Sequence, residues 1–197
     1  LRPDDPGVYA MAFAHVRDAD EEIRESATDL LCAYVQAHTY QALPNVEQLI
    51  GMMQSAMKDE ALRDSACVVL AGMSDERAQN VLRAAMKSKD TQLRMAVLSA
   101  AGAWYEPWVD DILISALGDS NREIRENAYR SLMDRGRPVI ARAEKELLTL
   151  AKSSRDKGFR YEVASTLAAL GNQQGGEIMR SDDAINYLPR AEALALQ

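Results

Sequence analysis

The sequence is poor in the residues from which metal and disulfide sites are built. It has two cysteines, Cys32 and Cys67, and two histidines, His15 and His38, among 197 residues. No CxxC pair and no cluster of His, Asp or Glu at ligand spacing occurs, so neither a zinc site nor a disulfide framework is predicted. Each cysteine lies within an apolar helical pattern, and both are expected to be small buried side chains.

Long apolar runs and an excess of basic charge are also missing. No stretch approaches the length of a membrane span, and the N-terminal LRPDDPGVYA lacks the apolar core of a signal peptide. The net charge of −7 disfavours binding to nucleic acid or to an anionic membrane, since both need a basic surface. We therefore expect no nucleic-acid partner and no membrane insertion, with the cytoplasm slightly favoured. The missing initial Met indicates a processed chain or a piece of a longer one.

Sequence motifs of catalysis are missing as well. The chain has no GxSxG, no P-loop and no GxGxxG. Nothing in the sequence places a Ser, Cys or Lys beside a base that could activate it. The sequence therefore predicts no catalytic residue, no metal, no cofactor and no enzymatic activity.

What the sequence does have is one short motif written five times, Asp-x-x-apolar-Arg, with Asn replacing Asp in the fourth copy. The five pairs of end residues are Asp20 and Arg24, Asp59 and Arg63, Asp90 and Arg94, Asn121 and Arg125, and Asp156 and Arg160. The apolar residue before each Arg recurs at steps of 39, 31, 31 and 35 residues. Periods in this range are typical of stacked supersecondary units.

Each copy predicts a helix, because apolar or small residues continue at the fourth and eighth positions after the motif's apolar residue. A second amphipathic segment precedes each motif, and Pro44, Pro107 and Pro138 stand at the expected starts of three of these segments. Glycine is expected to end the later copies in a left-handed cap, at positions Gly72, Gly102, Gly136 and Gly171. The predicted helix-turn-helix repeats span residues 7–36, 45–73, 75–102, 107–136 and 138–171.

The repeated Asp and Arg have a structural explanation. The Asp can cap the second helix of its repeat, and the apolar residue enters the core. The Arg lies at the margin of the buried stripe, where its guanidinium can reach its own Asp or the adjacent turn. We expect the ten motif residues to form a structural ladder along the stack rather than an anion-binding track.

The pattern Asp-x-x-[Ile/Leu/Phe]-Arg-x-x-[Ala/Val] resembles the HEAT repeat. The 31-residue steps resemble the short bacterial subclass seen in phycobilin lyases. The resemblance implies an all-α fold, a right-handed, armadillo-like α-solenoid of about five HEAT-like repeats forming one domain over residues 1–197. Residues 172–197 would be a C-terminal capping segment, with Ile178, Ile185 and Leu188 in a helix pair.

In such a stack the second helices would line the concave side, and two surfaces are candidates for binding a partner. Positions two and six residues after the motif's apolar residue would face the concave side; the candidates among them are Glu25, Asp29, Asp64, Met95, Glu126, Arg130 and Tyr161. The alternative surface is the inter-repeat loop AWYEPW, with Trp104, Tyr105 and Trp108. Each set also has a structural interpretation, as a solvated helix face or as a hydrophobic staple between repeats.

The function predicted from these features is a scaffold or adaptor that binds another protein or a peptide of basic character. No cofactor is implied. The alternative suggested by the resemblance is a chromophore-handling enzyme similar to phycobilin lyases, for which the sequence assigns no chromophore-holding residue.

Overall fold

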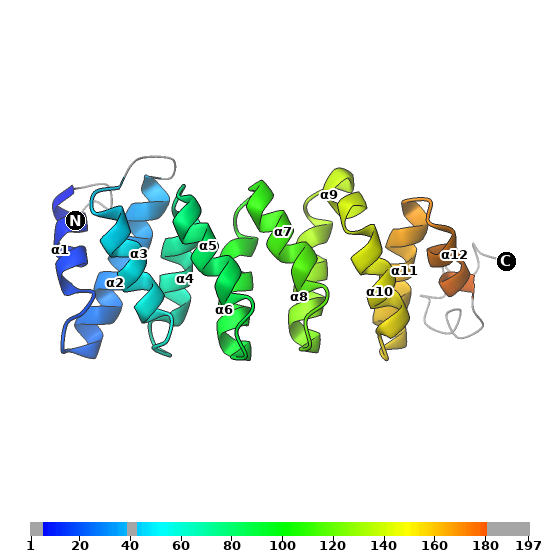
Figure 1. The fold of residues 1–197 in the computed structure, drawn as a ribbon, viewed down its shortest axis with the longest axis horizontal. Helices are drawn as coiled ribbons and strands as arrows, with labels where there is room; N and C mark the ends of the chain where they lie inside the picture. The colour runs from blue at the N-terminus through cyan, green and yellow to red at the C-terminus, as the bar shows by residue number, and fades with distance from the viewer. Residues whose placement is uncertain (1–5, 39–42, 181–197) are drawn as a thin grey trace. The chain divides into compact units, whose positions relative to one another are not determined.

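In the computed structural model, residues 6–38 and 43–180 are described, and these residues form twelve α-helices and no β-strand (Figure 1). The chain divides into two compact units, residues 1–112 and 113–197. The helices are α1 (Pro6–His15), α2 (Glu21–Ala37), α3 (Val46–Ala56), α4 (Arg63–Gly72), α5 (Glu76–Ala85), α6 (Thr91–Gly102), α7 (Pro107–Ala116), α8 (Arg122–Met133), α9 (Arg137–Arg142), α10 (Glu144–Ser153), α11 (Lys157–Ala169) and α12 (Gln173–Arg180).

Unit 1 is a stack of three helix pairs. α1 packs on α2, α3 on α4 and α5 on α6, while the second helices pack in sequence, α2 on α4 and α4 on α6 (Figure 1). The fourth- and eighth-position residues of the motif fill the core: Ala27, Leu31, Ala66, Leu70, Val97 and Ala101 are all at most 4% exposed. The helical period found in the sequence is therefore the period of the buried stripe.

Unit 2 contains the helix pair α10 and α11, with α12 packed on both. α9 contacts α8 and α10. The segment before the fifth motif, predicted as one helix, is divided at Ala143 into α9 and α10. Tyr129 of α8 contacts α11. Its hydroxyl lies 2.8 Å from Thr166 Oγ1, and its ring packs edge to face on the ring of Phe159.

The predicted fold class, an all-α solenoid of HEAT-like helix pairs, is confirmed by these helices and their pairwise packing. The organisation as a single domain over the whole chain stays a prediction. Of the predicted capping segment, α12 carries Ile178, while Ile185 and Leu188 lie outside the described residues.

The motif's first residue caps the second helix in four of the five copies. Side-chain oxygens of Asp20, Asp90, Asn121 and Asp156 accept backbone N–H groups from the first turn of α2, α6, α8 and α11. Asp59 differs, because it accepts the N–H of Ala61 and α4 begins only after Leu62. A helix whose first N–H groups are satisfied in this way starts at a defined residue.

The motif's Arg fastens the second helix to the turn before it. In four copies it donates to the carbonyl six residues earlier: Arg24 to Asp18 at 3.0 Å, Arg63 to Met57 at 3.3 Å, Arg94 to Ser88 at 2.8 Å and Arg125 to Asp119 at 2.7 Å. The ion pairs of Arg24 and Arg63 go to Asp59 and Asp90 of the following repeat, at 4.0 and 3.5 Å. Of the two contacts expected for the Arg, its own Asp or the adjacent turn, these four copies make the contact with the turn.

The expected left-handed glycines are found only in the later repeats. Gly136 and Gly171 have φ of 83° and 92°, a conformation that side chains rarely adopt. Gly72 and Gly102, in contrast, are the last residues of α4 and α6. At Gly72 the reason for glycine is a close approach, since an added Cβ would lie 2.9 Å from Val35 Cγ1 and 3.3 Å from Trp104 Cζ2.

Candidate functional site

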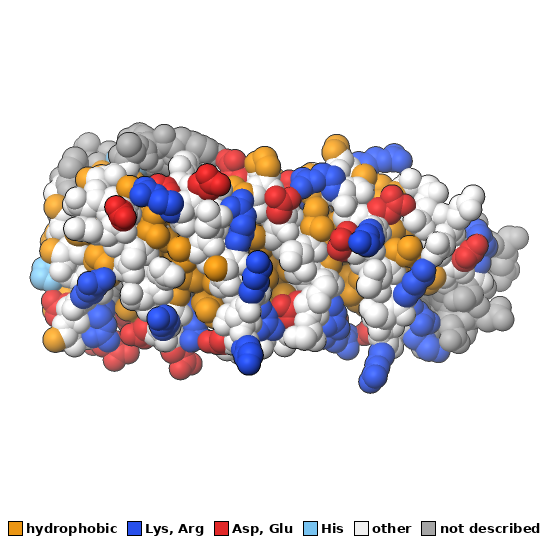
Figure 2. Space-filling view, viewed as in Figure 1, with side chains coloured by type: hydrophobic (Ala, Val, Ile, Leu, Met, Phe, Trp, Pro, Cys, Tyr) orange, Lys and Arg blue, Asp and Glu red, His pale blue; other side chains and the backbone are white. Residues whose placement is uncertain are grey.

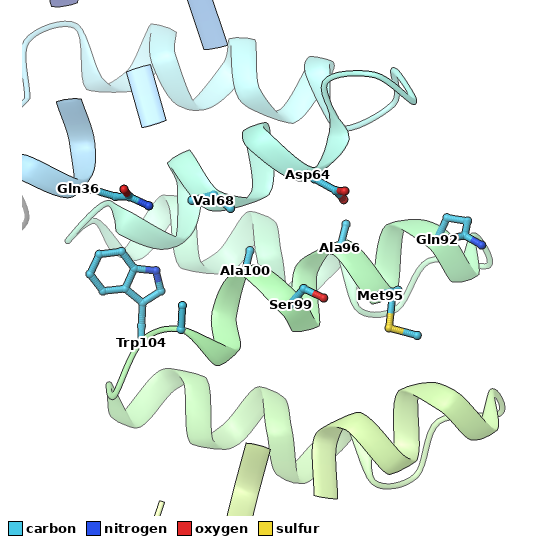
Figure 3. Close-up of a pocket in the computed structure, with 10 residues that line it drawn as sticks. Gln36, Asp64, Val68, Gln92, Met95, Ala96, Ser99, Ala100 and Trp104 are labelled. Atoms are coloured by element: carbon cyan, nitrogen blue, oxygen red, sulfur yellow. The ribbon is translucent and has the colours of Figure 1, made fainter. Parts of the chain in front are cut away.

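A groove of about 640 Å³ runs along unit 1 between α4 and α6, and we call it the α4–α6 groove (Figure 3). Its lining residues are Gln36, Asp64, Val68, Gln92, Met95, Ala96, Ser99, Ala100, Ala103 and Trp104. Asp64 and Val68 enter from α4, Gln36 comes from the end of α2, and α6 supplies most of the rest. Trp104 stands at one end of the groove, and Gln92 and Met95 lie toward the other (Figure 3).

One face of α6 forms the base of this groove. Gln92, Met95, Ala96, Ser99, Ala100 and Ala103 share this face, because each lies three or four residues from another of the set. Ala96 and Ala100 are 5% and 4% exposed, and their short side chains leave room where longer ones would fill the hollow. The sequence argument found Met95 on this face but missed the Gln and Ala positions, although the same spacing would have found them.

Trp104 is held at the end of the groove by the close contact with Gly72 described above. Its side chain is partly buried, and it also lines a second hollow of about 210 Å³ beside Ala71 and Met73 at the end of α4. An indole between two hollows offers apolar surface to each, and Trp is among the residues that most often anchor a bound partner.

The acidic residues predicted on the concave side of the first repeats, Glu25, Asp29 and Asp64, lie at exposed positions of α2 and α4. Asp64 lines the groove, while Glu25 and Asp29 lie outside it on α2. Asp29 is tied to α4, since its Oδ1 accepts the Ser65 hydroxyl at 2.8 Å. Unit 1 as a whole has ten Lys and Arg against eighteen Asp and Glu, so its field favours a cationic ligand.

The three remaining residues predicted on the concave side, Glu126, Arg130 and Tyr161, belong to unit 2. Glu126 accepts a hydrogen bond from the guanidinium of Arg122 and lies 3.8 Å from Arg130, so its charge is balanced locally. Tyr161 is a partly buried residue of α11. An ion-paired Glu attracts a ligand weakly. We therefore base the binding hypothesis on Asp64 and Met95 rather than on these three residues.

The alternative site, the AWYEPW loop, is divided by the structure. Tyr105 is 73% exposed, whereas Trp108 is 8% exposed and belongs to the core. Trp104 belongs to the α4–α6 groove. The two surfaces predicted separately from the sequence therefore meet at Trp104, while Trp108 is buried.

The described residues gather little that could perform chemistry. Burial raises the pKa of Cys67 to about 12 and also raises the pKa of Cys32, so both thiols stay neutral at physiological pH. Within residues 6–38 and 43–180, no three His, Cys, Asp or Glu side chains are grouped as metal ligands. None of the described helices is both long and apolar enough to cross a membrane.

Part of the chain matches a known protein family. The family model for HEAT repeats matches residues 47–132, which run from α3 through α8 and contain every lining residue of the α4–α6 groove except Gln36. No curated protein is significantly similar to the chain. HEAT repeats commonly serve as protein-interaction scaffolds, whose stacked helices present extended binding surfaces.

Proposed function

We propose that this chain, in which residues 47–132 match the HEAT-repeat family, is a non-catalytic scaffold that holds a basic segment of a partner protein in its α4–α6 groove. The observation that carries the proposal is the combination of residues in that groove. Exposed Asp64 and the apolar side chains of Val68, Met95 and Trp104 line the same hollow of about 640 Å³. A single hollow thus offers both a charge and apolar contacts.

Charge and shape favour a short segment with two kinds of side chain. A Lys or Arg of the partner would pair with Asp64, aided by the excess of acidic residues in unit 1. An apolar side chain would enter between Ala96 and Ala100 and rest on Trp104, where apolar surface is available for burial. Gln36, Gln92 and Ser99 can hydrogen-bond to the backbone of the segment.

Selection from a library of random peptides tests the proposal directly, because the groove itself chooses the sequences that it binds. We expect the selected peptides to combine Lys or Arg with an apolar residue. Asp64→Lys should slow the association of these peptides, and added salt should slow it too, because the charge is exposed. Met95→Ala should instead speed dissociation, because it removes apolar contact.

Glu25→Lys is the matched control, since Glu25 lies on α2 outside the groove. It makes the same charge reversal, and surface plasmon resonance should show a smaller effect of it than of Asp64→Lys. If the selected peptides bind equally well to Asp64→Lys and Met95→Ala but fail to bind after changes in Glu126, Arg130 or Tyr161, the groove is not the binding site.

A further inference from the structure

A second apolar surface lies on α1 and α2, away from the α4–α6 groove in sequence and in its lining residues. A hollow of about 330 Å³ there is lined by Met11 of α1 and by Ile23, Ala27 and Leu30 of α2. Met11 and Ile23 are each 42% exposed, and Tyr105 is the one other exposed large apolar residue in the described part of the chain. We call Met11, Asp20, Ile23 and Leu30 the N-terminal face.

Ile23 is an exception to the rule of its own motif. The corresponding Leu62 of the second repeat is 4% exposed, and Leu93 of the third is partly buried. Repeats two and three of unit 1 each have a preceding repeat whose second helix packs on theirs, α2 on α4 and α4 on α6. The N-terminal face therefore presents the apolar position that such stacking covers elsewhere.

Asp20 also differs from its counterparts in the next two repeats, in the ion pairs that these residues make. Its counterparts Asp59 and Asp90 lie 4.0 and 3.5 Å from Arg24 and Arg63 of the repeat before them. Asp20 caps α2 through Oδ1, and among the described residues no Lys or Arg lies within ion-pair distance of it. The first repeat thus has both halves of the inter-repeat contact, an apolar position and a carboxylate, ready for a partner.

We propose that the N-terminal face docks a helix pair of a partner protein, which places an Arg against Asp20 and apolar side chains against Met11 and Ile23. The packing within unit 1 supplies the template, because repeat one presents Arg24 to Asp59 in this way.

The charge around the face argues for a basic partner rather than a second copy of the chain. Acidic residues occupy the adjoining turn and the start of α2, at Asp18, Glu21 and Glu22, and Figure 2 shows acidic side chains gathered along the lower left edge of unit 1. Two copies meeting through this face would bring these carboxylates together, which is unfavourable. An Arg-bearing helix pair meets them with opposite charge.

A tandem duplication tests the proposal on the intact chain. Arg24 and Asp59 are 35 residues apart, and a second copy of residues 6–44 inserted before residue 6 places a new Arg the same 35 residues before Asp20. The added copy carries Met11→Leu, so that oxidation by hydroxyl radicals reports on the original Met11. We expect the oxidation of Met11 to fall several-fold relative to Tyr105, and the m value of unfolding to rise as more surface is buried.

Asp20→Asn separates the charge from the helix cap, because Asn caps a helix as well as Asp does. It should weaken the protection of Met11 in the duplicated chain and leave the stability of the original chain nearly unchanged. Unchanged oxidation of Met11 in the duplicated chain would overturn the proposal. So would sedimentation of the original chain as a dimer that Ile23→Glu converts to a monomer, since the occupant would then be a second copy.

Discussion

The guanidinium of Arg63 lies 3.5 Å from the carboxylate of Asp90, the residue that caps the second helix of the next repeat. The same Asp90 accepts the backbone N–H groups of Gln92 and Leu93. One carboxylate therefore both starts α6 and contacts the Arg of the preceding repeat. This double role explains why Asp and Arg recur together, and it supports the prediction that the ladder serves stability rather than ligand binding.

The ladder predicts that Arg94→Ala lowers stability without affecting binding. Arg94 is 6% exposed and donates to the carbonyl of Ser88 at 2.8 Å, so its loss leaves a partly buried acceptor poorly satisfied. We expect a loss of roughly 1–3 kcal/mol in the free energy of unfolding. Chemical denaturation measures it. A variant that is as stable as the original but no longer binds the selected peptides would show that the arginines are a binding track.

Gly72→Ala should destabilise the protein and disturb the Trp104 end of the groove. The added Cβ would lie 2.9 Å from Val35 Cγ1 and 3.3 Å from Trp104 Cζ2, so these side chains must move, at a cost of roughly 1–3 kcal/mol. Denaturation and Trp emission should both report the change.

The matched control is Gly51→Ala in the exposed middle of α3, where an added Cβ meets nothing within 4 Å. There the substitution should stabilise by about 0.4–1 kcal/mol, because alanine loses less entropy in a helix. Equal effects of the two substitutions would contradict the close packing of Gly72.

The contacts of Asp156 predict how the free energy of unfolding depends on pH. The Phe159 backbone N–H, and after it the Arg122 guanidinium at 2.6 Å, hold the pKa of Asp156 below its usual value. A carboxylate with a lowered folded-state pKa stabilises the fold above its unfolded-state pKa, and this contribution is lost as the pH falls through the folded-state value.

Asp156→Asn keeps the helix cap but cannot ionise. The difference in unfolding free energy between the original chain and this variant should therefore shrink as the pH is lowered from about 5 toward 2. Denaturation at a series of pH values measures it. A difference that stays constant over this range would show that Asp156 gains nothing from its charge in the folded state.

The chromophore-handling alternative predicts a spectroscopic signal that the scaffold does not. Enclosing a large planar ligand needs an aromatic pocket, and the chain has only two Phe and two Trp. Trp108 is buried in the core, which leaves Trp104 as the tryptophan of the groove. We expect no absorbance shift when a bilin is added to the protein. A saturable, stoichiometric shift would favour the enzyme.

The repeats could be predicted from the sequence because helix period, cap and core position are local properties of each motif. The cap of Asp90 and the burial of Val97 follow from their place in the pattern. The pairing of Arg63 with the next repeat rather than its own Asp could not be predicted, because it depends on how two repeats pack. The position of Trp104 in the same groove as Asp64 and Met95 also depends on how the helices pack, so it could not be predicted either.

Hydroxyl-radical footprinting with a selected basic peptide tests the central claim most directly. Met95 and Trp104 line the groove and have readily oxidised side chains, while Tyr161 on α11 is an internal reference outside it. We expect saturating peptide to lower the oxidation of Met95 and Trp104 and to leave that of Tyr161 unchanged. Unchanged oxidation of Met95 and Trp104, with protection at Tyr161 instead, would contradict the claim that the α4–α6 groove holds the partner.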